Sequence, residues 1–273
     1  RNQMTTFQKV IRYLAMALAI FLTVSIIGGV LGAVGLFGGL FDDDAVLDDA
    51  KTYTVSGSIT KLEVIINAAD FTIKQAEAFS VESNLKHLTV KEENGVLKIE
   101  ENKRFGITYN DAMLILYIPA NTVFETVDIT TGAGRLTADA LFTDSLKLEL
   151  GAGEVNIASL NAAKDADING GAGKITISGG SLRNLNVDMG VGQLNLTSAV
   201  RGNNVFDLGI GETNVTLIGS KEDYKINAEK GIGNITIDGK SVSDINDIDN
   251  GDNNIEVSGG IGTINLEFKE ELE

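Results

Sequence analysis

The feature that most constrains this chain is a G-x-G motif that returns about every 20 residues. Gly132, Gly151, Gly171, Gly190, Gly209 and Gly231 each open such a motif, and Gly251 opens the variant "GDN". The intervals between these glycines are 19, 20, 19, 19, 22 and 20 residues. A period this steady is typical of a repeat protein, in which each unit buries its apolar face by stacking on its neighbours.

Residues of one kind fall into columns when the units are aligned on the first glycine. Three residues before it stand Ile129, Leu148, Ile168, Val187, Phe206, Ala228 and Ile248. Five residues before it stand Val127, Leu146, Ala166, Leu185, Asn204, Ile226 and Asn246. Mostly polar residues lie between the two columns, and this alternation predicts a strand with one buried face.

The alternation resumes after the glycines. The inward column is predicted to hold Leu136, Val155, Ile175, Leu194, Ile235 and Ile255, with Val215 joining it if "GETNVTLIG" carries two extra residues. The outward column is predicted to hold Thr137, Asn156, Thr176, Asn195, Thr216 and Thr236. Each unit is therefore a strand, a glycine corner, a second strand and a variable polar stretch.

Two architectures satisfy this pattern. A row of antiparallel hairpins would use G-x-G as a three-residue loop, whereas a parallel β-helix would use it as a corner between stacked coils. Columns of like residues favour stacking in register, so we expect an all-β fold: a parallel β-helix, or solenoid, with glycine-cornered coils of about 20 residues. A dinucleotide-binding loop is disfavoured, because it needs a third glycine and a following helix.

An apolar run precedes the repeats. Tyr13 to Phe41 carries no charge, and about 20 helical residues span a hydrocarbon core of about 30 Å. Basic residues precede this run and Asp42 to Asp44 follow it, which predicts an N-in, single-pass signal-anchor with the C-terminal part outside the cytoplasm. A cleaved signal peptide is the alternative, but the run exceeds an ordinary apolar region and no A-x-A site follows it.

These features divide the chain as follows. We expect a cytoplasmic basic flank (1–12), a transmembrane signal-anchor (13–41), an acidic linker (42–52) and an exterior β-helix domain (53–273), the last made of an N-terminal β section (53–131), regular coils (132–268) and a charged tail (269–273). Within the N-terminal section, "EENGV" at Glu92 to Val96 predicts a hairpin with an Asn-Gly turn.

Composition narrows the chemistry. The chain has a formal net charge of −16, one histidine and no cysteine. No clustered basic surface is visible, which argues against nucleic acid as a partner. The absence of cysteine excludes thiol catalysis, disulfides and zinc–thiolate sites.

The run "LILYIPANTVFETVDITTGAGRLTADAL", with the later "GIGNITI" and "GGIGTINLEF", resembles the putative-adhesin family of β-strand-repeat domains of unknown function. That family is related to the head-GIN domain of putative autotransporter adhesins. The resemblance spans about Tyr53 to Phe268. It implies a β-helix-like solenoid that is exported or membrane-anchored in bacteria, and it assigns no catalytic residues.

The column two residues before the first glycine is the candidate site. We call it the acidic column; it contains Thr130, Glu149, Asn169, Asp188, Asp207, Glu229 and Asp249. One interpretation is a solvated face, since like charges about 5 Å apart in water repel by only about 1 kcal/mol. The other is a stripe in which Glu149, Asp188, Asp207, Glu229 and Asp249 bind Ca²⁺ or a cationic polymer through hard oxygen ligands. No other cofactor is expected.

Three functions remain open. The favoured one is non-enzymatic: adhesion, binding of an envelope polymer, glycan or surface protein, or an accessory role in surface sensing at the cell membrane. The second is a carbohydrate-active β-helix enzyme that uses Asp188 and Asp207 with Arg183 and Arg201. The third is a structural spacer or assembly module.

Overall fold

The structure is a computed structural model that describes residues 47–102, 111–229, 231–242, 245–248 and 251–270. The predicted anchor at 13–41 and residue Asp249 lie outside these ranges. Within the ranges, no helix is long and apolar enough to cross a membrane.

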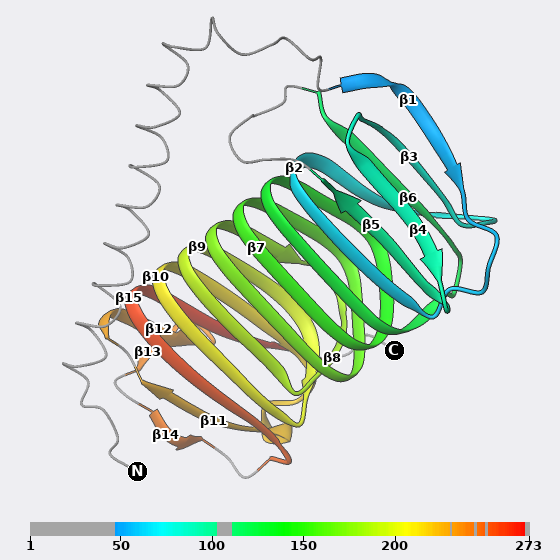
Figure 1. The fold of residues 1–273 in the computed structure, drawn as a ribbon. Coiled ribbons are helices and arrows are strands. Elements are labelled where there is room, and N and C mark those ends of the chain that lie inside the picture. Colours follow the sequence, from blue (N-terminus) through cyan, green and yellow to red (C-terminus); the bar gives the residue numbers. More distant parts are fainter. Residues whose placement is uncertain (1–46, 103–110, 230, 243–244, 249–250, 271–273) are drawn as a thin grey trace, which may run out of the picture.

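The described chain is all-β, as predicted, with one 3₁₀ turn at Lys221–Asp223. Figure 1 shows coils that follow one another along a single axis, and the sheet they form is open rather than closed on itself. The strands are β1 (Leu47–Thr54), β2 (Lys61–Ala76), β3 (Ser80–Leu85), β4 (Leu88–Glu93), β5 (Val96–Glu101), β6 (Met113–Pro119), β7 (Val123–Ile177), β8 (Gly180–Arg183), β9 (Leu185–Arg201), β10 (Asn203–Ile218), β11 (Tyr224–Glu229), β12 (Ile232–Ile237), β13 (Lys240–Val242), β14 (Ile245–Ile248) and β15 (Asn253–Lys269).

Successive coils pair in parallel with the glycine corners in register. Gly192 of β9 lies opposite Gly173 of β7 on one side and Gly211 of β10 on the other. The two predicted columns before the glycines point inward: from Val127 to Ile226 and from Ile129 to Ala228, every member is buried. The side chain of Ile248 is not among those that the structure describes. Stacking in register therefore turns the repeat of the sequence into continuous buried columns.

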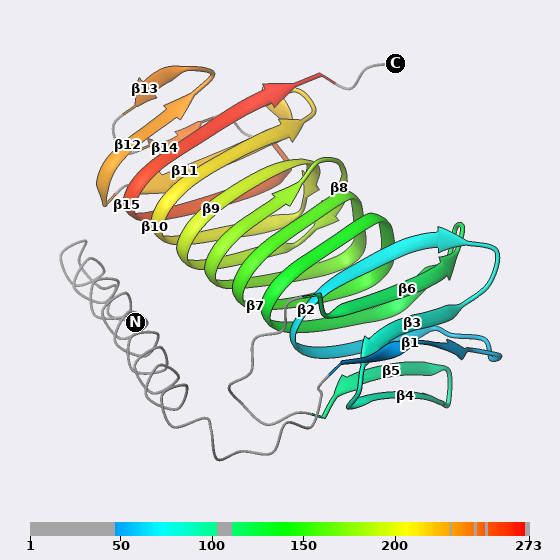
Figure 2. The same cartoon turned by 90° about the horizontal axis from the view of Figure 1, so that it is seen from above.

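The order of the last coils departs from the sequence. β10 pairs in parallel with β15, and β15 pairs on its other edge with β11 and β12. The C-terminal coil is thus inserted between two coils that precede it in the chain, as the red β15 shows between β10 and β11 in Figure 2. Sequential stacking of the predicted repeats is wrong at this end.

This insertion corrects two predicted positions, the corner at Gly251 and the inward position of Ile255. Gly260 and Gly262, rather than the "GDN" at Gly251, form the G-x-G corner of the inserted coil, since Gly211 lies opposite Gly262. Ile255 packs opposite Ile226 in the strand before the corner, and Ile264 takes its place in the column after it.

The coil with "GETNVTLIG" contains no insertion at its corner. Thr213 lies opposite Leu194, and Val215 lies opposite Leu196 rather than Leu194. Thr213 is buried, so a hydroxyl residue occupies a core position. The interval of 22 arises later in the coil, in the stretch around the 3₁₀ turn.

The corner glycines are required by the close approach of neighbouring coils. Gly192 has a φ of 149°, which side-chain-bearing residues rarely adopt. A Cβ atom at this position would overlap the carbonyl oxygen of Gly173 on the preceding coil. The motif is therefore a structural requirement of the stack.

The N-terminal end is also out of order. β2 is itself a coil, because it pairs in parallel with β7, and its corner is Asn67–Ala69 instead of G-x-G. β5 and β6 return to pair with the outer edge of β2. The regular coils thus begin at β2, before the predicted start at 132.

Antiparallel strands cover both ends of the stack. β4 pairs with β5 through the predicted Asn94–Gly95 turn, in which both residues have positive φ. β1 pairs with β3 and begins at Leu47, inside the predicted linker 42–52. At the other end, β13 and β14 pair with β12 and β11. Such covering limits edge-to-edge aggregation.

Candidate functional site

The acidic column follows the stacking order rather than the sequence order. Asn169 lies opposite Asp188, and Asp188 lies opposite Asp207. Ser258 of the inserted coil then separates Asp207 from Glu229. Asp188 and Asp207 are therefore neighbouring carboxylates, with Cα atoms about 4.8 Å apart, whereas Asn169 or Ser258 separates them from Glu149 and Glu229.

An open groove of about 510 Å³ runs beside the glycine corners of three coils. Its polar wall is the acidic column from Thr130 through Glu149 and Asn169 to Asp188, and its floor is the backbone of the corner glycines. The corners form this floor because glycine leaves no side chain above the stacked backbone. The groove runs across the coils, which suits an extended ligand.

Glu149 is paired on both of its carboxylate oxygens. Lys147 Nζ lies 2.9 Å from Oε1, and Thr130 Oγ1 donates a hydrogen bond of 3.5 Å to Oε2. The hydrogen bond to Glu149 raises the pKa of Lys147, and the charges of Asp128 and Asp167 on adjacent coils act in the same direction. The positive charge of Lys147 thus offsets the negative charges of carboxylates on three coils, which reduces the repulsion between them on this solvated face.

Among the residues that the structure describes, no group of three or more histidine, aspartate or glutamate side chains is placed to share one metal ion. The interruptions by Asn169 and Ser258 account for this, because they spread the carboxylates of the acidic column. Asp249 falls outside the described residues.

The residues of the predicted enzymatic cluster do not line a common groove. Asp188 borders the groove at the glycine corners. Arg183 and Arg201 border a separate groove of about 250 Å³ on another side of the coil. The turn at Asn184, whose φ is 47°, separates β8 from β9 and turns the chain from one side to the other.

A ladder of amide side chains crosses four coils on the strand after the corner. Asn214 Nδ2 donates to Asn195 Oδ1 at 2.9 Å, and Asn265 Nδ2 donates to Asn214 Oδ1 at 2.8 Å. Thr236 Oγ1 donates to Asn265 Oδ1 at 2.7 Å. We call these four residues the asparagine ladder. It follows the corrected coil order, because Asn265 lies between Asn214 and Thr236.

The asparagine ladder was only partly predicted from the sequence. Asn195 and Thr236 belong to the predicted outward column, which has Thr216 at the position that Asn214 occupies in the structure. Asn265 is not in that column, because the predicted repeats end with the corner at Gly251. The signal that identifies it is the G-I-G motif in "GIGTIN", in which Asn265 follows Gly260 by five residues, as Asn195 follows Gly190.

Comparison with known proteins assigns the family. The family model described as Toastrack DUF4097 matches residues 47–267, which is most of the chain. The chain belongs to the Toastrack DUF4097 family. In this Toastrack domain, the matched residues cover every coil from β2 to β15 together with the antiparallel strands at both ends. No curated protein matches the sequence.

Several solved structures are similar to this Toastrack chain. A putative cell adhesion protein from Clostridium sporogenes is 17% identical, with a TM-score of 0.39, and the match covers 81% of this chain and 99% of that one. A putative adhesin from Bacteroides fragilis is 13% identical, with a TM-score of 0.36 and coverages of 80% and 95%. A putative lipid binding protein from Parabacteroides distasonis is 14% identical, with a TM-score of 0.32 and coverages of 81% and 96%.

Proposed function

We propose that this Toastrack protein is a non-enzymatic, adhesin-like module that binds an extended envelope polymer outside the cytoplasm. The observation that supports this most directly is the stacking of coils in register, which repeats the same polar columns along one axis. A polymer lying along that axis meets a polar side chain of the same column at each coil. Many weak contacts then sum, because each bound unit holds the next at high effective concentration.

The groove beside the glycine corners is the proposed binding surface. Thr130, Asn169 and Asp188 provide hydroxyl, amide and carboxylate groups on three of the four coils that border it. Such groups suit the hydroxyls of a glycan. A Ca²⁺ ion between the neighbouring carboxylates Asp188 and Asp207 and the polymer is a variant of this proposal, with hard oxygen ligands from both sides.

Display at the membrane is the second part of the proposal. The uncharged run from Tyr13 to Phe41 would act as the signal-anchor, with its basic flank inside and the coils outside. A relation to the head-GIN domain would be consistent with this placement. Protease treatment of intact cells tests it: degradation of the coils from outside supports the orientation, and full protection until lysis contradicts it.

The binding test is co-sedimentation of the full chain, held in detergent micelles, with isolated bacterial envelope polymer, with and without Ca²⁺. We expect saturable binding, reduced stepwise by Asp188→Asn and Asp207→Asn. The matched control is Glu77→Gln with Asp139→Asn, which removes two exposed charges outside the groove. Calcium dependence would assign the ion to Asp188 and Asp207.

The remaining outcomes of this test each favour one of the two alternative functions. Absence of binding in both conditions overturns the polymer proposal and leaves the spacer. If the native chain released soluble fragments from the polymer, and Asp188→Asn lowered the rate of release by orders of magnitude, the enzyme would be favoured over the binder.

A further inference from the structure

Two arginines lie side by side on a different side of the coil from the acidic column. Arg183 of β8 pairs directly with Arg201 of β9 in a parallel register, while the preceding Leu182 and Val200 are buried. Both arginines are exposed. We call them the arginine pair. Their Cα atoms are about 4.8 Å apart, as on any neighbouring strands.

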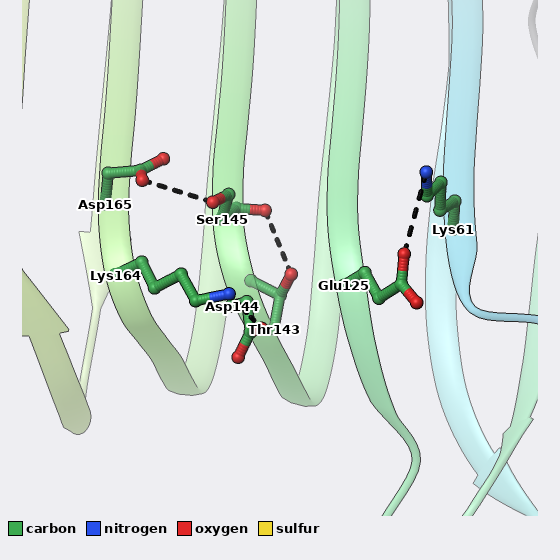
Figure 3. Close-up of polar contacts among 7 residues, drawn as sticks. All are labelled: Lys61, Glu125, Thr143, Asp144, Ser145, Lys164 and Asp165. Carbon is green, nitrogen blue, oxygen red and sulfur yellow. Dashed lines mark hydrogen bonds and ion pairs between the residues drawn. The ribbon is translucent and has the colours of Figure 1, made fainter.

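Within the described ranges, neither guanidinium forms an ion pair or a side-chain hydrogen bond. The carboxylates of the adjoining coils have partners of their own, as Figure 3 shows. Asp144 is held by Lys164 at 2.7 Å, a hydrogen bond that raises the pKa of Lys164, and Asp165 accepts from Ser145 at 3.1 Å. Like charges opposite one another in a sheet repel, so an anion between them would be stabilised.

Acids on the far side of Arg201 are also engaged. Asp223 Oδ2 accepts a hydrogen bond of 3.1 Å from the backbone of Ser220, and Glu222 accepts one from the Ser220 hydroxyl. These acids line a separate polar groove that Arg201 also borders, with Asp252. No ion pair within 4.0 Å links any of the three to Arg201 in the described chain.

The groove at the arginine pair is amphipathic. Apolar side chains also line it, Phe142 and Val123, the latter 63% exposed. Ser181 lies on β8 with Arg183, and Asn161 pairs with it from the preceding coil. An apolar surface beside a few convergent polar groups is the usual form of a small-molecule site. A sugar ring has one apolar face and hydroxyl edges, so its apolar face suits Phe142 and Val123 and its hydroxyls suit polar groups such as Ser181.

A second groove, of about 400 Å³, shares Arg201 and extends toward Lys269 of the inserted coil, with Glu270 beside it. The basic groups therefore continue from Arg183 through Arg201 to Lys269 across the coils. An extended ligand with spaced negative charges matches this arrangement.

We propose that the arginine pair binds a carboxylate of an acidic, uronate-bearing glycan, with a neighbouring sugar ring of the same glycan on Phe142 and Val123. Guanidinium groups bind carboxylates through two parallel hydrogen bonds, which a single ammonium does not provide. This site goes beyond the proposed polymer groove, because it lies on another side of the coil and recognises the opposite charge.

The test is calorimetric titration of the full chain in detergent micelles with tetragalacturonate at low salt. We expect saturable binding that Arg183→Gln with Arg201→Gln weakens at least roughly tenfold, as the loss of charge-assisted hydrogen bonds predicts. Lys74→Gln with Lys240→Gln is the matched control; it removes the same charge from exposed positions that line neither groove and should change affinity by less than about twofold. Arg183→Lys with Arg201→Lys keeps the charge and should give an intermediate loss.

Two further ligands define the chemistry. Fully methyl-esterified tetragalacturonate should not bind, because it has no charge, and inorganic phosphate should bind more weakly than tetragalacturonate, because it lacks the ring. No binding by the native chain, equal losses in the control, or an unchanged affinity in the Arg183→Gln, Arg201→Gln variant would overturn the proposal. Phosphate binding as tight as that of tetragalacturonate would overturn the glycan assignment. Failure here would leave the groove at the glycine corners untouched, since its test uses Asp188 and Asp207.

Discussion

At the scale of single residues, the stack depends on positions where no other side chain fits. The corner glycines allow neighbouring backbones to approach, and Asn204 satisfies backbone groups inside the core. Asn204 is fully buried; its Oδ1 accepts from Leu185 N at 2.9 Å, and its Nδ2 donates to the carbonyls of Gly202 and Asn254. It therefore ties three coils together where the C-terminal coil is inserted.

Replacing Gly192 by alanine should destabilise the protein strongly, by several kcal/mol, because the new methyl group overlaps the Gly173 carbonyl and the φ of 149° is unfavourable. Gly239 is the control: its φ is 73°, but a Cβ there meets nothing within 4 Å. Gly239→Ala should cost only about 1 kcal/mol. Chemical denaturation of both variants measures the difference, and equal losses would contradict the close-approach argument.

Replacing Asn204 by alanine should lower the free energy of unfolding by about 2–4 kcal/mol, because it leaves buried backbone groups without partners. Asn203→Ala is the matched control. Its side chain is exposed, and the hydrogen bond that it donates to Asn184 Oδ1 comes from its backbone N–H, which alanine keeps. We expect that change to stay within about 0.5 kcal/mol. Thermal unfolding followed by circular dichroism distinguishes them, and a tolerant Asn204 would contradict its role in the core.

At the scale of elements, β15 is the strand on which the C-terminal end depends. It pairs with β10 on one edge and with β11 and β12 on the other. The last coil in the chain thus lies between two coils that precede it in the sequence. In a repeat stack, each coil is stabilised mainly by its direct neighbours. The loss of β15 would therefore leave β11 and β12 without the strand on which they pack.

A chain ended after Asp252 should therefore keep its coils from β2 to β9 and lose the ordered structure of β11 and β12. Limited proteolysis with mass spectrometry should show rapid cleavage in β11 and β12 and protection of 111–201. A chain ended after Glu270 should be digested like the native protein. If β11 and β12 stayed protected without β15, the coils would have to support one another in sequence order.

The sequence predicts the elements better than it predicts their order. Period-two columns such as Ile129 to Ala228 identify buried faces, because burial depends on alternation along each strand. The stacking order depends on which edges meet, and Gly231 and Gly260 carry the same G-I-G corner, so local pattern does not distinguish them. The predicted acidic column is not continuous in the stack, because Ser258 of the inserted coil lies between Asp207 and Glu229.

At the scale of the whole molecule, the stack presents differently charged sides to its surroundings. The groove at the glycine corners has an acidic wall, and the groove at the arginine pair has a basic end. Both depend on coils that repeat in register, so both proposals rest on the coil order. Covered ends at β4 and β13 suit a module that works as a single unit rather than as a growing fibre.

The coil order can be tested directly with paired cysteines, since the chain contains none. Glu212, Thr263 and Asn234 are exposed and each lies three residues after the first glycine of its corner. Thr263 is opposite Glu212 and opposite Asn234, at the Cα spacing that a disulfide spans. Oxidation should therefore link Glu212→Cys with Thr263→Cys, and Thr263→Cys with Asn234→Cys, while Glu212→Cys with Asn234→Cys stays reduced. Rapid linkage of 212 to 234, with none of 212 to 263, would show that the coils stack in sequence order and would contradict the account.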